Sequence, residues 1–161
     1  VNEQISPTPE KTTETPLPKG TETILLVEDE PMVRDIARKS LEMSGYRVLE
    51  AANGREALDI VEREQDAIDL VLTDVIMPQM GGRELAAKLS SRLPGTKILY
   101  MSGYTDDALM HHGVLQTNFA FLEKPFTPET LNGKVRDLLD QKDYLPLAST
   151  PKVLDSRQPS A

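Results

Sequence analysis

The chain has 161 residues, which is enough for one domain with a buried core and too few for two. Its net charge of −8 excludes the basic surface that nucleic-acid binding requires, so no nucleic acid is expected as a partner. Cysteine is absent, which excludes disulfides and thiol chemistry and fits a cytoplasmic location. The sequence has neither a signal-peptide pattern nor an apolar run of about 18 residues, so no direct membrane contact is expected.

Both ends of the chain are rich in proline and lack apolar periodicity. Segments of this composition bury too little surface to offset the entropy lost on ordering. We therefore expect a disordered Pro/Thr-rich linker over residues 1–21, one domain over residues 22–142 and a flexible tail over residues 143–161.

Short apolar runs alternate with amphipathic segments through the central region, which predicts strands alternating with helices. In chain order we expect a strand at 24–27, a helix from 31 to about 45, a strand at 46–50, a helix from 54, a strand at 69–73, a helix at 83–91, a strand at 98–101, a weaker helix at 105–112, a strand at 118–122 and a last helix from 128. The alternation implies right-handed crossovers and an α/β domain, with a parallel sheet covered by helices on both faces.

Local signals support several of the helix boundaries. Pro31 suits the first position of a helix and Gly45 suits its end. Asn53 and Glu56 form a capping-box pattern, and Thr127 followed by proline is typical of a helix start. The residues expected on the inward helix faces are Val33, Ile36, Ala37 and Leu41 in the first helix, Ala57, Leu58 and Val61 in the second, and Leu131, Val135, Leu138 and Leu139 in the last.

Polar residues follow four of the expected strands at their carboxyl ends, where ligands bind in doubly wound sheets. They are Glu28, Asp29 and Glu30 after the first strand, Asp74 after the third, Ser102 after the fourth and Lys124 after the fifth. Crowded carboxylates repel one another unless a cation neutralises them. A hard cation such as Mg²⁺, with positions open to a phosphoryl oxygen, suits this set.

Four segments in this order and spacing resemble the signature segments of the response-regulator receiver family. They are Val27-Glu28-Asp29-Glu30, Thr73-Asp74-Val75-Ile76-Met77-Pro78, Met101-Ser102-Gly103 and Glu123-Lys124-Pro125-Phe126. The resemblance extends over residues 22–142. It implies a single flavodoxin-like (βα)5 domain with strand order 2-1-3-4-5.

The resemblance also implies a role for each residue at the strand ends. Asp74 would accept a phosphoryl group from a kinase phosphohistidine. Glu28 and Asp29 would hold Mg²⁺ together with Asp74 and the backbone carbonyl of Ile76, and Lys124 would contact the phosphoryl oxygens. This assignment agrees with the physics of phosphoryl transfer, which depends mainly on positioning and charge neutralisation.

Four residues are implied in switching the domain or in tuning the lifetime of its phosphoryl group. Ser102 would be the switch hydroxyl and Phe121 the aromatic switch residue. Ile76 and Tyr104 would flank the approach of water to the phosphoryl group and would tune its lifetime. Neither side chain carries an amide or carboxylate that would orient an attacking water.

Other interpretations give these residues simpler roles. Glu28 and Asp29 would merely cap the helix that Pro31 begins, Gly81-Gly82 reads as a loop into a helix, and His111-His112 reads as a solvated surface pair. Among rival functions, a haloacid-dehalogenase-type aspartyl phosphatase needs a second acid where Ile76 stands. A nucleotide-binding module needs a glycine-rich phosphate loop that the sequence lacks.

The resemblance favours the C-terminal receiver of a hybrid sensor histidine kinase, with a free-standing single-domain regulator as the alternative. No output domain is expected after Gln141, since only 20 residues follow it. The Pro/Thr-rich first segment supports the hybrid interpretation. The implied partners are the dimerisation and phosphotransfer domain of a histidine kinase and a histidine phosphotransfer protein. The domain itself would be a monomer or weak dimer that catalyses only its own phosphorylation and dephosphorylation, in the cytoplasm, with a parent kinase that can be anchored in the inner membrane.

Overall fold

The computed structural model describes residues 19–64, 67–103 and 120–141. The expected helix at 105–112, the first two residues of the strand expected at 118–122, Tyr104 and the histidine pair lie outside these ranges, as do most of the two end segments. Within the described residues, no helix is both long and apolar enough to cross a membrane.

Five parallel strands form one sheet in the order β2-β1-β3-β4-β5, which confirms the predicted flavodoxin-like arrangement. The strands are β1 (Thr23–Val27), β2 (Arg47–Ala51), β3 (Leu70–Asp74), β4 (Lys97–Ser102) and β5 (Ala120–Glu123). Every residue of β1 and β3 is buried. This agrees with their continuous apolar sequences, which are typical of strands covered on both faces.

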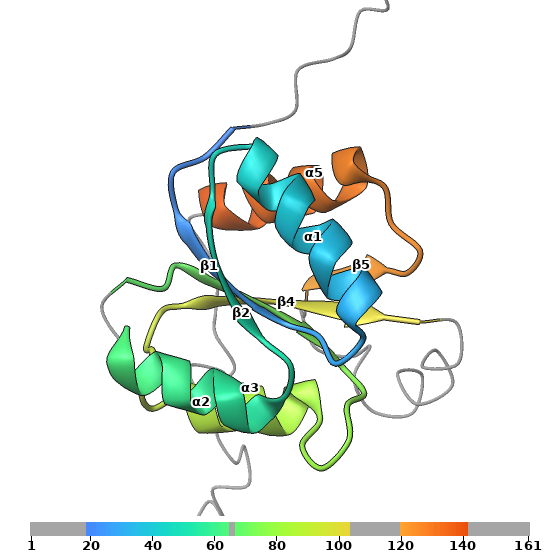
Figure 1. Ribbon diagram of the computed structural model, residues 1–161. Helices are drawn as coiled ribbons and strands as arrows, with labels where there is room; N and C mark the ends of the chain where they lie inside the picture. Colours follow the sequence, from blue (N-terminus) through green and yellow to red (C-terminus); the bar gives the residue numbers. More distant parts are fainter. Residues whose placement is uncertain (1–18, 65–66, 104–119, 142–161) are drawn as a thin grey trace, which may run out of the picture.

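Helices cover both faces of the sheet (Figure 1). The described helices are α1 (Pro31–Met43), α2 (Gly54–Arg63), α3 (Gly82–Leu89) and α5 (Pro128–Asp140). The α1 and α5 helices lie on one face, over a core that includes Leu26, Leu72 and Leu131. The α2 and α3 helices lie on the other, over a core that includes Leu25, Val71 and Leu85. This double covering leaves the ends of the strands as the accessible edges of the sheet.

The predicted helix signals are largely confirmed. The Asn53 side chain accepts the Glu56 amide at 2.9 Å, while the Glu56 carboxylate accepts the amide of Ala52 rather than that of Asn53. The Thr127 hydroxyl accepts the Thr130 amide at 3.1 Å. After α1, Gly45 adopts φ 95°, a left-handed conformation that ends the helix without the steric cost of a side chain.

Of the residues predicted on inward helix faces, Ile36 is at the surface, and Val33, Leu58 and Leu139 are only partly buried. Ile36 is 53% exposed, so its assignment to the buried face of α1 is wrong. Leu139 is only partly buried, although it packs against the core under α5. Element boundaries differ by one or two residues. For example, β3 begins at Leu70, one residue later than predicted, and the carboxylate of the preceding residue, Asp69, accepts the Thr23 amide at 2.8 Å.

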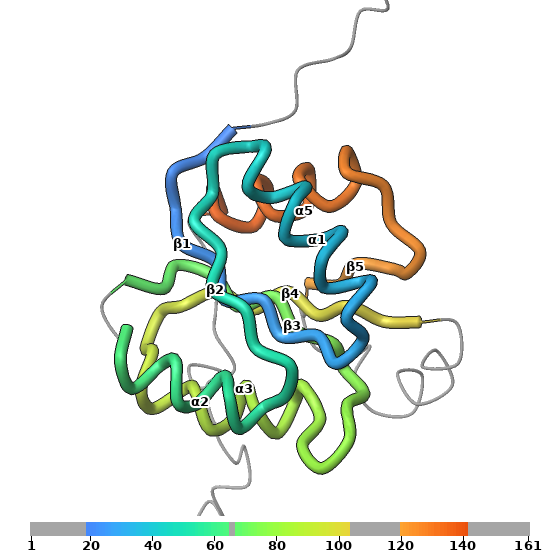
Figure 2. Tube along the Cα trace, viewed as in Figure 1, coloured from blue at the N-terminus to red at the C-terminus, as the bar shows by residue number. Residues whose placement is uncertain are grey.

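The described chain enters and leaves the fold at the amino-terminal edge of the sheet. The Arg136 guanidinium of α5 donates to the Lys19 carbonyl and pairs with Glu22 at 2.9 Å. Lys97, the first residue of β4, donates to the carbonyls of Leu139 and Gln141 at 2.7 and 2.8 Å. The last turn of α5 therefore lies beside the start of β1 (Figure 2).

Candidate functional site

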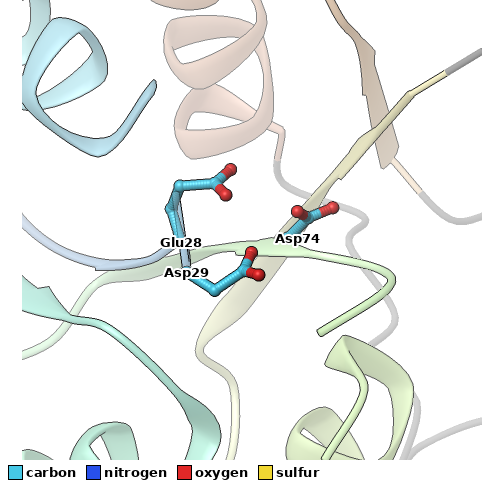
Figure 3. A group of neighbouring side chains, drawn as sticks. All are labelled: Glu28, Asp29 and Asp74. Atoms are coloured by element: carbon cyan, nitrogen blue, oxygen red, sulfur yellow. The ribbon is translucent and has the colours of Figure 1, made fainter. Parts of the chain in front are cut away.

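Three carboxylates meet at the opposite, carboxyl-terminal edge of the sheet. Glu28 and Asp29 follow β1 directly, and Asp74 is the last residue of β3. One carboxylate oxygen from each lies within 4.8 Å of the others, and the three groups point into a common space (Figure 3). Glu28 is fully buried and Asp74 is 6% exposed, whereas Asp29 is exposed to solvent.

Strand pairing brings these acids together. Strands β1 and β3 are parallel neighbours in which Val27 pairs with Thr73, so the next residues, Glu28 and Asp74, emerge side by side. Helix α1 has Glu30 as its N-cap and no side-chain cap bond. The simpler interpretation, in which Glu28 and Asp29 cap that helix, is therefore not what the structure shows.

Lys124, which follows β5, bridges two of the acids. Its Nζ lies 2.7 Å from Glu28 Oε2 and 2.9 Å from Asp74 Oδ2. The Lys124 amide also donates to the Ser102 carbonyl at 2.8 Å, which ties the start of the β5–α5 loop to the end of β4. The sequence predicted that Lys124 and Asp74 would meet, and the structure brings them into direct contact.

The electrostatics of the site favour an additional positive charge. Burial raises the pKa of Glu28 to about 7, although the Lys124 ammonium and the Glu30 amide act in the opposite direction. Burial alone would lower the pKa of Lys124, but its hydrogen bonds to Glu28 and Asp74 outweigh that effect and hold the pKa above its ordinary value. One ammonium thus faces three carboxylates, and Glu28 ionises with difficulty unless a further cation is present.

Of the four residues expected to switch or tune the site, the structure describes three. Ser102 is the buried last residue of β4, the strand next to β3. Phe121 of β5 is partly buried, and its ring centroid lies 5.6 Å from that of Tyr100. Ile76 lies two residues beyond Asp74 and is 44% exposed. Tyr104 lies outside the described residues.

Two residues that support the site were not assigned this role from the sequence. The Arg34 guanidinium of α1 donates to the Glu28 carbonyl at 2.7 Å. Gly82, read from the sequence as part of a loop, is the first residue of α3 and packs directly against the Asp74 carbonyl. A glycine at the start of a helix was the sequence signal that the backbones of α3 and Asp74 approach closely. The contact of Arg34 has no comparable sequence signature.

The donor set fits Mg²⁺. All three acidic groups offer hard carboxylate oxygens, which Mg²⁺ prefers, and Glu28 and Asp74 are fixed by burial and by Lys124. Because Asp29 is exposed, the space between the three carboxylates is open to solvent. A Mg²⁺ site requires this opening, since the bound ion keeps several of its water molecules. Glu28, Asp29 and Asp74 are the described carboxylates that would hold the ion, beside the Ile76 carbonyl expected from the resemblance.

Comparisons with known proteins identify the family. The family described as "Response regulator receiver domain" matches residues 24–136. The sensor kinase CckA of Brucella abortus is 40% identical over 124 residues, which make up 77% of this chain but only 13% of that kinase. The response regulator receiver protein CpdR of the same organism is 34% identical over 116 residues, or 72% of this chain and 95% of CpdR.

Solved structures agree with this relationship. The receiver domain of the hybrid histidine kinase CckA superposes with a TM-score of 0.62 at 38% identity, covering 73% of this chain and 98% of that domain. A response regulator from Chloroflexus aurantiacus gives a TM-score of 0.66 at 27% identity, covering 76% and 100%. The family match runs from the first strand into the last helix, and relatives of receiver length share about a third of their residues, so the chain belongs to the response-regulator receiver family of two-component phosphorelays.

Proposed function

We propose that this receiver accepts a phosphoryl group on Asp74 from the phosphohistidine of a histidine kinase, in a reaction that requires Mg²⁺. The observation that carries the proposal is the arrangement around Asp74. Its carboxylate contacts Lys124 at 2.9 Å and lies in the group of acids that can hold a hard cation. Phosphoryl transfer needs little beyond an aligned nucleophile and charges that neutralise the moving group.

The chemistry requires only one covalent exchange. An oxygen of the Asp74 carboxylate attacks phosphorus while the bond from phosphorus to the imidazole nitrogen of the donor breaks, which leaves a neutral imidazole after protonation. Bound Mg²⁺ would supply charge neutralisation at the phosphoryl oxygens. The Lys124 ammonium lies beside Asp74, where it would neutralise part of the negative charge on the phosphoryl oxygens. Ser102, at the end of the adjacent strand, is the proposed hydroxyl that donates to the new phosphoryl group.

Phosphorylation by a small donor tests the assignment. Incubated with acetyl phosphate and Mg²⁺, the protein should gain one phosphoryl group by intact-mass spectrometry, and Asp74→Asn should gain none. Asp59→Asn, a matched change on the exposed side of α2, should be labelled like wild type. Labelling of wild type should also stop in a chelator. Label on another residue, or label that survives Asp74→Asn, would refute the proposal.

We further propose that the receiver works as the C-terminal part of a hybrid sensor histidine kinase and exchanges its phosphoryl group with a histidine phosphotransfer protein. The support is the 40% identity to the sensor kinase CckA and the proline-rich segment before the domain. A free-standing regulator is the second candidate, because CpdR is matched over 95% of its length. Phosphotransfer profiling against the kinases and phosphotransfer proteins of the source organism distinguishes the two. Preferred exchange with a phosphotransfer protein supports the hybrid, and preferred transfer from a separate kinase supports the free-standing regulator.

A further inference from the structure

The loop that carries the acidic pair is held in place by an arginine from the helix that follows it. Arg34 lies in α1, and its Nη1 donates to the Glu28 carbonyl at 2.7 Å. That carbonyl belongs to the peptide that joins Glu28 to Asp29. The bond therefore fixes the orientation of the peptide between the two acids without contacting either carboxylate.

Besides the ion pair with Lys124, two other contacts support this loop. The Glu28 amide donates to the Ala51 carbonyl of β2 at 3.1 Å, and Glu28 Oε1 accepts the Glu30 amide at 3.0 Å. Together with the Arg34 bond, these contacts hold Glu28 at its amide, its carbonyl and its side chain. Of the three, only the Arg34 bond comes from a side chain outside the loop.

Arg34 is itself held by the neighbouring strand. Its Nε lies 4.0 Å from Glu50 Oε1 on β2, and the same oxygen pairs with Arg38 Nε at 3.3 Å. Arg38 also contacts Asp35 and Glu42 along α1. The side chain of Arg34 is 22% exposed, so its guanidinium is confined between the helix, the strand and the loop.

The charge of Arg34 has the wrong sign for attracting a cation. A guanidinium beside a site for Mg²⁺ repels the ion, so removing that charge should by itself tighten binding. If Arg34 strengthens Mg²⁺ binding, it must therefore do so by orienting the Glu28–Asp29 peptide. The two effects have opposite signs, which makes them separable by experiment.

We propose that Arg34 is a positioning residue for the cation site, which orders the Glu28–Asp29 peptide so that both acids face Asp74. This inference rests on the proposed Mg²⁺ requirement of the receiver. Outer-sphere residues that orient metal ligands are typically worth a factor of ten or more in affinity, roughly 10–100-fold. Arg34 would be such a residue acting through the backbone.

The test compares Arg34→Met with Arg38→Met by direct titration of Mg²⁺, followed through backbone amide chemical shifts. Both variants remove one positive charge from α1, but Arg38 makes no described contact with the acidic loop. Arg34→Met should bind Mg²⁺ about tenfold more weakly than wild type. Arg38→Met should stay within about twofold, because a partly exposed charge is screened.

A metal-free measurement provides a second readout. Hydrogen exchange at the Glu30 amide, which donates to Glu28 Oε1, should accelerate in Arg34→Met and stay unchanged in Arg38→Met. If Arg34→Met does not fold, Arg34→Lys replaces it. The shorter lysine side chain cannot contact the Glu28 carbonyl and the Glu50 carboxylate at the same time, so weaker Mg²⁺ binding is again expected.

Equal or tighter Mg²⁺ binding by the Arg34 variant, or an equal loss in both variants, would overturn the inference. Failure of wild type to bind Mg²⁺ would instead overturn the proposed function.

Discussion

The absence of a side chain at Gly82 lets α3 start directly against the backbone of Asp74. The Gly82 amide donates to the Val75 carbonyl at 2.8 Å, and a Cβ at this position would overlap the Asp74 carbonyl oxygen. That oxygen is main chain and cannot move aside as a flexible side chain would. Gly82 therefore determines how close α3 comes to Asp74.

We expect Gly82→Ala to displace Asp74 as well as to destabilise the fold. The unfolding free energy should fall by about 2 kcal/mol, as for other overpacked sites, and phosphorylation by acetyl phosphate should slow at saturating Mg²⁺. Gly81→Ala is the control, since its Cβ would meet the Val75 carbonyl at 3.0 Å and needs only a small adjustment. Denaturant unfolding and labelling rates measure both variants. Equal effects in the two would contradict this role of Gly82.

The side chain of Ile76 lies on the solvent side of the site, two residues beyond Asp74. It is 44% exposed and has no group that would orient a water molecule. We expect phosphorylated Asp74 to persist for many minutes when no partner is present. Replacing Ile76 by Asn together with Tyr104 by Glu should speed hydrolysis about tenfold, equivalent to about 1.4 kcal/mol of barrier. The decay of labelled protein after donor removal is the measurement, and a wild-type half-life of seconds would exclude this shielding.

Among the helices, α1 has an unusual distribution of apolar residues. Met32 is 73% exposed and Ile36 53%, although the helix also contributes Ala37 and Leu41 to the core. These two residues are in the half of the helix that begins beside Glu28 and Asp29, whereas Met43, which is 79% exposed, is the last residue of the helix. Exposed apolar side chains around a reactive site suit contact with a protein partner. We expect the phosphohistidine-bearing partner to pack against them.

A matched pair of variants on α1 tests this contact. Ile36→Glu should lower kcat/KM for phosphotransfer from a cognate histidine kinase about tenfold, or roughly 1.4 kcal/mol, and should leave labelling by acetyl phosphate unchanged. Met43→Glu introduces the same charge at the far end of the helix, where the side chain is 79% exposed, and should have no effect on either donor. Equal loss with both donors for Ile36→Glu would mean that the substitution disturbs the site itself.

The elements were largely predictable, and the errors have a common cause. Strands β1 and β3 are continuous apolar runs, so both their existence and their burial followed from composition. Ile36 was misplaced because an exposed apolar residue fits the helical period as well as a core residue does. Helical periodicity identifies an apolar face, and it does not show whether every residue on that face is buried.

The site was predictable as far as strand topology determines it. Glu28, Asp29, Asp74 and Lys124 all stand at the carboxyl ends of parallel strands, which meet at one edge of the sheet, and the structure brings them together. The Arg34 contact depends on the path of a long side chain. Contacts of this kind depend on the packed geometry of the whole domain, and no local pattern indicates them.

At the scale of the whole molecule, Glu28 makes stability depend on pH. Its pKa rises from the ordinary 4.5 to about 7 in the folded protein, chiefly because of burial. The folded state therefore binds this proton more tightly than the unfolded chain does. The resulting stabilisation is complete below the ordinary pKa and is lost as the pH rises through about 7.

In a chelator, we expect the unfolding free energy of wild type to fall relative to that of Glu28→Gln between about pH 4.5 and about pH 8, by on the order of 3 kcal/mol. Glutamine is the matched variant because it resembles the protonated acid and does not titrate. Denaturant unfolding across this pH range gives the difference directly. Added Mg²⁺ at the upper end should restore wild type more than the variant, and parallel pH curves for the two proteins would contradict the raised pKa.

The contacts of Arg136 and Lys97 place the entry and exit of the described domain together, at the edge of the sheet opposite Asp74. A domain whose ends adjoin can be inserted as a cassette into a surface loop of another protein without being stretched. The edge that carries the acids then faces outward whichever host carries the domain. The same geometry allows a new peptide link between residues near 19 and 141, with the chain reopened elsewhere, to yield a circular permutant in which the acidic edge stays accessible.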